Sequence, residues 1–311
     1  MTSDPGRFTL SMDFELGWGV VETGQWRARE RAGVYERLRP VMRRTLDMLD
    51  TLEIPLTWAA VGGMASPQEA LEFDHLPSHL QECSHRFVTE ARQSTRDGRD
   101  LVDMVRASRV PHDLGSHSFS HARFSAPGYD DAARHHDLTL AQKALMHWGG
   151  APVSFIFPEN DAASLVPVVQ AGLRHVRLAP AGVAATGSLA KLSAKLARPP
   201  AAGPVQAPQG LSAETGTMFF HWPLQDRFGL RRRMAMRQSA MALQAAATQG
   251  CAIHYWLHPF NLAEIPGLEE RFNALMHTVA DLRDRGAIRV ATIADRADRS
   301  KTASTTGTGR G

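Results

Sequence analysis

Two carboxylates close an apolar segment near the start of the chain. The segment Phe8–Phe14 has the composition of a strand, and Asp13 and Glu15 stand at its end. Residues two apart on a strand point to the same face, so both carboxylates can enter one pocket. There they could bind a metal ion or transfer a proton, while a capping or turn pair at a strand end is the structural alternative.

Histidines follow two later apolar segments. His117 and His121 lie four residues apart, and His258 comes directly after Ala252–Leu257. Two histidines four apart on a helical turn share one face and can ligate one metal ion. The residue after His117 is Ser rather than Glu, so the pair is not the HExxH motif of zinc proteases. Packing or structural hydrogen bonding remains an alternative for each of these histidines.

Together these groups would support metal-assisted hydrolysis. One carboxylate and two imidazoles make a three-ligand site for Zn²⁺ or a similar divalent ion, with a position open for water. The ion lowers the pKa of bound water towards about 7, a second carboxylate takes the water proton, and a separate histidine protonates the leaving group. Asp13, Glu15, His117, His121 and His258 meet these needs, and no GxSxG, P-loop or GxGxxG motif offers a competing chemistry.

Alternating apolar and amphipathic segments predict the elements that position these groups. Strands are expected at Phe8–Phe14, Leu56–Val61, His112–Ser116, Val153–Phe157, His175–Ala179, Met218–Trp222, Ala252–Leu257 and Ile288–Thr292. Helices are expected around Leu38–Leu52 and at Asp130–His147, Ala162–Ala171, Leu230–Thr248 and Gly267–Arg285. Eight strands alternating with helices indicate a parallel α/β fold, and eight is the number that closes a barrel. A doubly wound open sheet remains the alternative, because spacing alone does not separate the two.

A single domain over residues 1–298 is expected, with two excursions and a tail. Residues 66–110 predict a helical excursion over one end of the barrel. Residues 180–216 are rich in Ala, Pro and Gly and predict a long loop, with a lid as one interpretation. Residues 299–311 form a Ser/Thr/Gly tail that is expected to be disordered. His135 and His136 lie in a charged helical segment and are expected to be solvated.

Composition excludes several classes of protein. The chain is 43% hydrophobic and 22% charged, which excludes a disordered chain. A net charge of +3 over 311 residues is too weak a field to indicate nucleic-acid binding. Cys83 and Cys251 form no CxxC pair, Met1–Arg7 resembles no secretory leader, and no apolar run is long enough to span a bilayer. A cytoplasmic protein without a membrane span is therefore expected, and the oligomeric state is not indicated.

The motifs resemble those of the polysaccharide deacetylases, the NodB-homology or carbohydrate esterase 4 family, across roughly residues 8–295. Asp13-Phe-Glu15 resembles a separated D-x-D/E form of the family's first motif. The resemblance implies that Asp13 is the catalytic base and Glu15 a metal ligand, or that these roles are exchanged. Gly115–His121 resembles the H-S/T-x-x-H motif, which implies that both of its histidines bind the metal.

The closing part of the pattern also resembles the family. Leu257-His258-Pro259 resembles the L-H motif, which implies that His258 is the general acid. The resemblance further implies a distorted (β/α) barrel of seven or eight strands and a divalent metal, most often Zn²⁺. The activity it implies is removal of an N-acyl group, most often N-acetyl, from an amino sugar in a glycan or glycan precursor. The substrate partner is then a carbohydrate or a sugar conjugate.

Several residues depart from the family pattern or extend it. Ile156 stands where the family carries an arginine that orients the base, and Asp226 is the candidate partner of the acid histidine. The candidate substrate contacts are Trp18, Pro158, Glu159, Asn160 and Trp222, with core packing as the alternative for the aromatic ones. Hydrolysis of a non-sugar amide, and a barrel that binds glycans without turnover, remain alternative functions. A nucleic-acid or anionic-surface binder, suggested by Arg231–Arg233, is the least supported.

Overall fold

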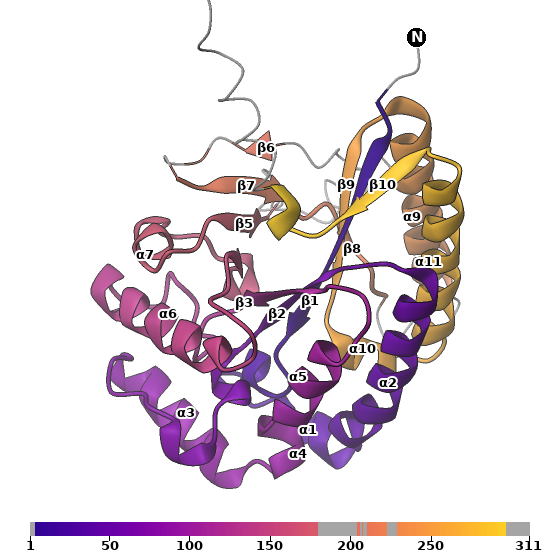
Figure 1. Ribbon diagram of the computed structural model, residues 1–311. Coiled ribbons are helices and arrows are strands. Elements are labelled where there is room, and N and C mark those ends of the chain that lie inside the picture. The colour runs from indigo at the N-terminus through magenta and orange to yellow at the C-terminus, as the bar shows by residue number, and fades with distance from the viewer. Residues whose placement is uncertain (1–3, 180–203, 206, 208–209, 223–228, 297–311) are drawn as a thin grey trace, which may run out of the picture.

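A single curved sheet forms the centre of the molecule, and helices cover its outer side (Figure 1). The computed structural model describes residues 4–179, 204–205, 207, 210–222 and 229–296. The strand order is β6-β7-β5-β4-β3-β2-β1-β9-β8, and β10 pairs with the start of β1. The strands are β1 (Gly6–Phe14), β2 (Thr57–Ala60), β3 (Asp113–Ser116), β4 (Ser154–Ile156), β5 (His175–Leu178), β6 (Pro204–Val205), β7 (Ser212–Thr215), β8 (Met218–Phe219), β9 (Ala252–Leu257) and β10 (Ile288–Ala291).

Every pairing is parallel except that of β6 with β7. The sheet curls into a half-barrel, and within the described residues no ladder joins β7 to β8 to close it. The fold is therefore a distorted (β/α) barrel, as the sequence predicts, and not the open doubly wound sheet. All eight expected strands are present, shortened at their ends in most cases.

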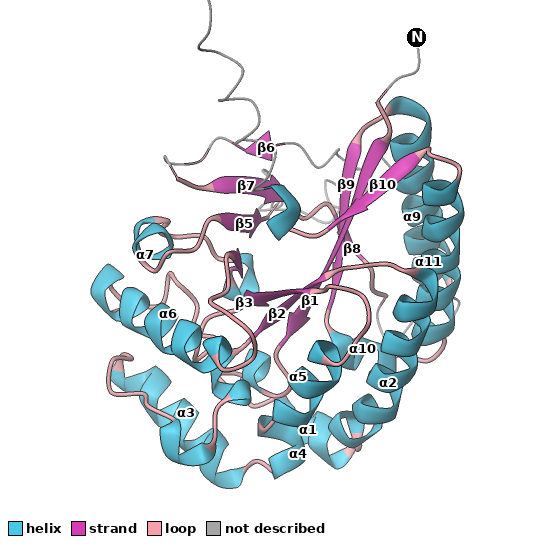
Figure 2. Cartoon of the chain, in the orientation of Figure 1, coloured by secondary structure: helices cyan, strands magenta, loops and turns pink. Residues whose placement is uncertain are grey.

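The helices lie outside the sheet (Figure 2). They are α1 (Trp26–Arg31), α2 (Val34–Leu52), α3 (Ser78–Glu90), α4 (Gln93–Arg96), α5 (Arg99–Arg106), α6 (Asp131–Met146), α7 (Val166–Gln170), α9 (Leu230–Gln249), α10 (Pro259–Glu264) and α11 (Leu268–Asp284). Short 3-10 turns are η1 (Trp18–Val20), η2 (Gly62–Ala65), η3 (Gln68–Ala70), η4 (Pro158–Asn160) and η5 (Ala294–Arg296). Helices α3, α4 and α5 lie within residues 66–110.

The expected loop at 180–216 is wrong at its end. Strand β7 occupies Ser212–Thr215 and pairs with β5, and the side chains of Ala213 and Glu214 are buried. The sequence conceals this strand because a buried Glu interrupts the apolar pattern that marks a strand. Residues 180–203, the tail at 299–311 and Asp226 lie outside the described residues, so the predictions made for them stay predictions.

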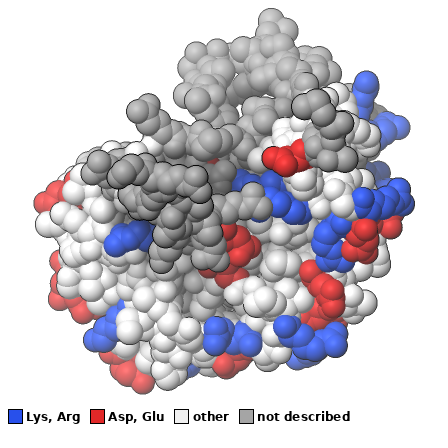
Figure 3. Space-filling model, turned by 45° about the horizontal axis from the view of Figure 1, so that its top comes forward, with Lys and Arg blue, Asp and Glu red and all other residues white. Residues whose placement is uncertain are grey.

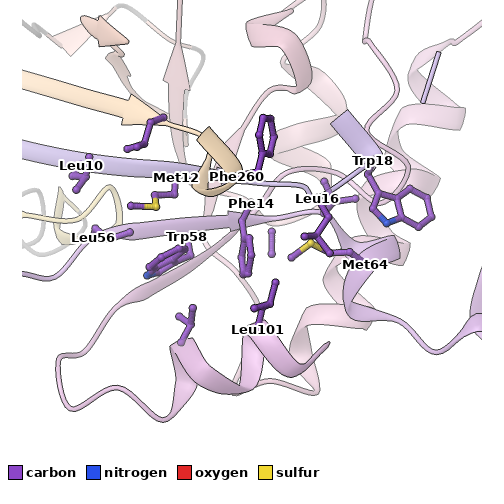
Figure 4. Close-up of a cluster of buried hydrophobic side chains, with 14 of the residues drawn as sticks. Leu10, Met12, Phe14, Leu16, Trp18, Leu56, Trp58, Met64, Leu101 and Phe260 are labelled. Carbon is purple, nitrogen blue, oxygen red and sulfur yellow. The ribbon is translucent and has the colours of Figure 1, made fainter. Parts of the chain in front are cut away.

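Strand β1 separates a hydrophobic layer from a polar barrel interior. Its alternate residues Leu10, Met12 and Phe14 are buried, and Figure 4 shows them in the hydrophobic cluster that also contains Trp58 of β2 and Leu101 of α5. The ring centroids of Phe14 and Trp58 lie 5.5 Å apart, edge to face. The intervening residues are also buried, and all are polar: Arg7, Thr9, Ser11, Asp13 and Glu15. Because side chains alternate along a strand, this second set faces the barrel interior.

Candidate metal centre and catalytic site

The carboxylate of Glu15 lies among three histidines at the carboxyl ends of β1, β3 and β9. Its Oε2 is 2.9 Å from His121 Nε2 and 3.4 Å from His117 Nε2, and its Oε1 is 3.6 Å from His258 Nε2. The structure therefore brings together residues that are separated by more than 200 positions in the chain. Barrel enzymes place their chemistry at this end of the strands.

The hydrogen-bonding partner of His117 fixes which of its ring nitrogens faces Glu15. Its Nδ1 is 2.7 Å from the carbonyl oxygen of Ile156, which leaves Nε2 directed to the site. A carbonyl bonded to the far nitrogen sets the tautomer and orientation of a metal-binding imidazole. Ile156, which stands where the family carries an arginine, thus contributes through its backbone rather than its side chain.

The segment from His117 to His121 is a loop and not the helical turn that the sequence suggested. Ser118 and His121 have φ values of 64° and 62°, in the left-handed region that is unfavourable for residues other than Gly. Asp137 of α6 holds the loop, because its carboxylate accepts hydrogen bonds from the backbone N–H groups of Phe119 and Ser120, at 2.9 and 3.2 Å. The hydroxyl of Ser118 accepts from the N–H of His121 at 3.0 Å. These bonds hold the ring centroids of His117 and His121 4.8 Å apart, although the segment is not helical.

A buried arginine that the sequence analysis did not single out holds Asp13. Arg177 of β5 donates from Nη1 and Nη2 to the two carboxylate oxygens of Asp13, at 2.6 and 2.8 Å. It also donates to Ser11 Oγ at 2.9 Å and to Asn160 Oδ1 at 3.0 Å. Its side chain is 0% exposed. Arg177 thus supplies, from β5, an arginine beside Asp13 like the one that the resemblance implies, and the signal in the sequence is an arginine inside the short strand segment His175–Ala179.

The polar interior continues below Asp13 towards the amino-terminal end of the barrel. His254 of β9 lies 2.8 Å from Ser11 Oγ through Nε2 and 2.7 Å from Glu214 Oε1 through Nδ1. Glu214 also pairs with Arg7. Two cations and two anions are thus buried as two matched pairs, linked through Ser11 and His254. Burying charges in matched pairs avoids the large cost of an isolated buried charge.

A neutral amide contacts His258, where the sequence analysis looked for an aspartate. Asn261 Oδ1 lies 3.2 Å from His258 Nδ1 and accepts from the backbone N–H of His258 at 3.4 Å. Asn261 is buried at the third position of α10, where it forms a capping box with His258. The contact at Nδ1 leaves Nε2 facing Glu15. The pattern that could have revealed Asn261 is its position three residues after a histidine that caps a helix.

The electrostatics keep both carboxylates ionised. Burial raises the pKa of Glu15, but the imidazoles of His258 and His121 outweigh it and hold that pKa well below its usual range. Burial likewise raises the pKa of Asp13, and the charge and hydrogen bonds of Arg177 outweigh it, so the net shift is downward. Burial lowers the pKa of His117 and keeps the ring neutral. For His121 burial also lowers the pKa, but the neighbouring Glu15 raises it more.

Glu15, His117 and His121 fit the requirements of a divalent metal site. Each offers a donor atom, all three donor atoms lie within 4.8 Å of one another, and all three side chains are buried. One carboxylate and two imidazoles, one of them neutral and held by a carbonyl, form the donor set of a catalytic zinc-type centre. Asp13 is not in this group, because Arg177 engages both of its oxygens.

The predicted substrate contacts are divided between the core and the rim. Trp18 is 1% exposed, donates from Nε1 to the carbonyl of Arg96 and packs edge to face on Phe87, so it presents no face to a sugar. Trp222 and Pro158 are also buried. Glu159 is exposed, and Asn160 contacts Arg177. Glu159 and Asn160 have φ values of 52° and 57°, which adds to the backbone strain around the site.

A different aromatic group lies beside His258. Phe219 of β8 is 38% exposed, stacks on Trp256 at 4.1 Å and on His221 at 4.7 Å, and lies edge-on to His258 at 5.8 Å. Trp256 is partly exposed. This aromatic cluster of Phe219, His221 and Trp256 is the exposed ring surface next to the candidate acid. The sequence could not reveal it, because neither exposure nor the pairing of β8 with β9 follows from local pattern.

The fold and the position of the polar residues define the class: this is a polysaccharide-deacetylase-type barrel. The chain is similar in structure to a Mycobacterium smegmatis protein assigned to the polysaccharide deacetylases, with a TM-score of 0.59 and 16% identity over 98% of this chain and 93% of that one. A Pseudomonas aeruginosa PAO1 protein with the same assignment gives a TM-score of 0.54 and 11% identity, over 93% of this chain and 88% of that one. The GH57-type branching enzyme of Pyrococcus horikoshii gives a TM-score of 0.56 and 10% identity, over 94% of this chain and 70% of that one.

At these identities the similarity shows the fold alone. No family model matches the sequence, and no curated protein matches it. The resemblance that the motifs indicated is confirmed at the level of the fold, which deacetylases share with glycan-processing enzymes of other chemistry. The choice between these chemistries therefore depends on the residues of the site.

The surface gives little further indication of function. Within the described residues, no helix is both long and apolar enough to cross a membrane. On the face in Figure 3, basic and acidic side chains are interspersed over the described part of the chain. The absence of a nucleic-acid partner and the cytoplasmic location stay predictions.

Proposed function

We propose that this protein is a metal-dependent hydrolase that removes an N-acyl group, most often N-acetyl, from an amino sugar in a glycan or glycan precursor. The observation that carries the proposal is the division of labour between two carboxylates on one strand. Glu15 lies among the imidazoles of His117, His121 and His258, whereas Asp13 is held by Arg177.

The residues have separate roles in this proposal. Glu15, His117 and His121 would hold the divalent ion, most often Zn²⁺, which lowers the pKa of water and polarises the acyl oxygen. Asp13 is the base: its lowered pKa keeps it ionised at neutral pH, and Arg177 fixes its orientation. His258 is the acid that gives a proton to the departing nitrogen from Nε2, while Asn261 holds its Nδ1. The contact between Asp13 and Arg177 favours this assignment over the exchanged one.

The same geometry disfavours glycosidic-bond cleavage, the chemistry named for the Pyrococcus horikoshii neighbour. A glycosidase of the common type needs one carboxylic acid that is protonated at neutral pH, which requires a raised pKa. Here the pKa of Asp13 is lowered by Arg177 and the pKa of Glu15 by its histidine neighbours. A pair of carboxylates that are both held ionised suits a metal ligand and a base.

The aromatic cluster supports a sugar as the group that carries the amide. Phe219 and Trp256 lie beside His258, so a sugar ring in contact with the exposed part of this cluster would place its N-acyl nitrogen near the acid. Glu159 is exposed and remains a candidate for hydrogen bonds to sugar hydroxyls.

The test is amine release from N-acylated sugars by metal-stripped and metal-reloaded protein. Zn²⁺ should restore turnover to the stripped wild type, and the same screen should include non-sugar amides. Asp13→Asn and His258→Ala should keep the ion of this site but lose turnover, whereas His117→Ala should lose that ion and turnover together. Unchanged turnover after metal removal would contradict the proposal. Metal-dependent turnover of non-sugar amides only would contradict its sugar part and leave the hydrolytic chemistry.

A further inference from the structure

A second group of metal-ligating side chains lies on the helical side of the molecule. Glu72 and His75 belong to the segment between η3 and α3, and His136 belongs to α6. One donor atom from each lies within 4.8 Å of the other two. None of the three residues belongs to the site described above, and the sequence analysis expected His136 to be merely solvated.

The three side chains already contact one another. His136 Nε2 lies 2.9 Å from Glu72 Oε1, and the rings of His75 and His136 have their centroids 5.0 Å apart. Two imidazoles this close repel each other when both are protonated. A cation bound between them would make the arrangement favourable.

His75 has the setting of a metal ligand rather than of a surface residue. Its side chain is only 7% exposed, and its Nε2 lies 3.0 Å from Asp137 Oδ1, so Nε2 donates to that carboxylate. Nδ1 is then the nitrogen that can offer a lone pair to an ion. That atom is buried and has no hydrogen-bond partner within the part of the chain that the structure describes. A carboxylate behind one nitrogen and a free lone pair on the other is the arrangement that orients metal-binding histidines.

We propose that Glu72, His75 and His136 form a second divalent-cation site. Two imidazoles and one carboxylate select a borderline transition-metal ion such as Zn²⁺ over Ca²⁺ or Mg²⁺, which prefer oxygen ligands alone. The exposure of Glu72 and His136 leaves the remaining coordination positions to water. Glu72 also lines a surface cavity of about 1260 Å³, which gives an ion access from solution.

Asp137 connects this second site to the first. The same carboxylate that contacts His75 accepts the N–H groups of Phe119 and Ser120, which lie between His117 and His121. An ion on His75 would therefore fix the carboxylate that supports the strained loop of the first centre. The second site is thus structural: it joins the 72–75 segment to α6 directly behind the two histidines. The proposal does not depend on the hydrolytic function of the first centre.

The stoichiometry of bound Zn²⁺ in the full-length protein tests the proposal. Chelator-stripped protein is titrated with Zn²⁺ against a chromophoric competitor, and bound ion is counted by elemental analysis after desalting. The variants are His136→Ala and Glu72→Ala for the second site, and His117→Ala for the first. His135→Ala is the matched control, because His135 is the neighbour of His136 on α6 but not a member of the group.

Wild type and His135→Ala should bind two ions, and each of the other variants one. His136 and Glu72 are exposed, so their replacement leaves the core intact. Two ions retained in both His136→Ala and Glu72→Ala, or one ion in wild type that only His117→Ala removes, would overturn the proposal. One ion in wild type that His136→Ala removes and His117→Ala does not would support the second site and contradict the first.

Discussion

Replacing Arg177 should both destabilise the protein and raise the pKa of Asp13. The guanidinium is wholly buried and makes two hydrogen bonds to the Asp13 carboxylate and one each to Ser11 and Asn160. Arg177→Met leaves the Asp13 charge buried without a partner, which costs about 3–5 kcal/mol. Because Asp13 can relieve that cost by binding a proton, the loss of stability should shrink as the pH falls below neutrality. Urea unfolding at several pH values measures this, with Arg177→Lys as the milder variant that keeps the charge.

A double variant separates an electrostatic role from a packing role. Asp13→Asn removes the unpaired charge, so Asp13→Asn/Arg177→Met should be more stable than Arg177→Met alone. The acid limb of the pH–rate profile should move to higher pH in Arg177→Lys, since the base loses its bidentate partner. A cost below about 1 kcal/mol for Arg177→Met, the range of an exposed pair, together with an unmoved acid limb in Arg177→Lys, would contradict an electrostatic role for Arg177.

Three further changes test other parts of the structure. Asn261→Ala should lower kcat about fivefold, because the bond that orients His258 is worth about 1 kcal/mol, and should leave the bound metal unchanged in elemental analysis. Burial lowers the pKa of His112 to about 4, so the unfolded chain binds its proton first as the pH falls below about 6.5. The His112 titration should then lower the free energy of unfolding by about 2 kcal/mol between pH 7 and pH 5. In His112→Gln, urea unfolding should show a pH-dependent loss that is smaller than that of wild type by this amount. Chelation should lower the Tm of wild type. Zn²⁺ at about 1,000 times its Kd should then restore about 4 kcal/mol of the free energy of unfolding for each site that it fills. An unchanged Tm after chelation would argue against both metal sites.

The local hydrophobic pattern predicts the strands that carry the site, but it does not predict β7, which completes the polar interior of the barrel. The eight expected strands are apolar runs bounded by turn residues, so each reveals itself without knowledge of its neighbours. Strand β7 reads Ser-Ala-Glu-Thr, and its buried Glu214 makes sense only beside Arg7 and His254. Those partners lie in β1 and β9, and no property of the sequence around Glu214 indicates them.

The same distinction applies to the site itself. Glu15, His117 and His121 could be found because each follows a strand and because parallel strands end on one side of the sheet. These side chains lie close together because of the order of the strands in the sheet. The conformation of the loop between the histidines could not be found, because it depends on the Asp137 carboxylate accepting two N–H groups from across the fold.

Arg177 shows why a missing motif residue need not mean a missing function. In the interior of a parallel barrel, side chains from every strand point towards the same axis, so a cation from β5 can reach a carboxylate on β1. The barrel requires that cation wherever it comes from, since Asp13 is buried and an unpaired carboxylate there would be protonated instead. The backbone of Ile156 is meanwhile engaged with His117, so the strand that carries the family's arginine still serves the site. The fold therefore requires a balance of buried charge. Two anions and two cations, paired as Asp13 with Arg177 and Glu214 with Arg7, meet that requirement along the length of the barrel.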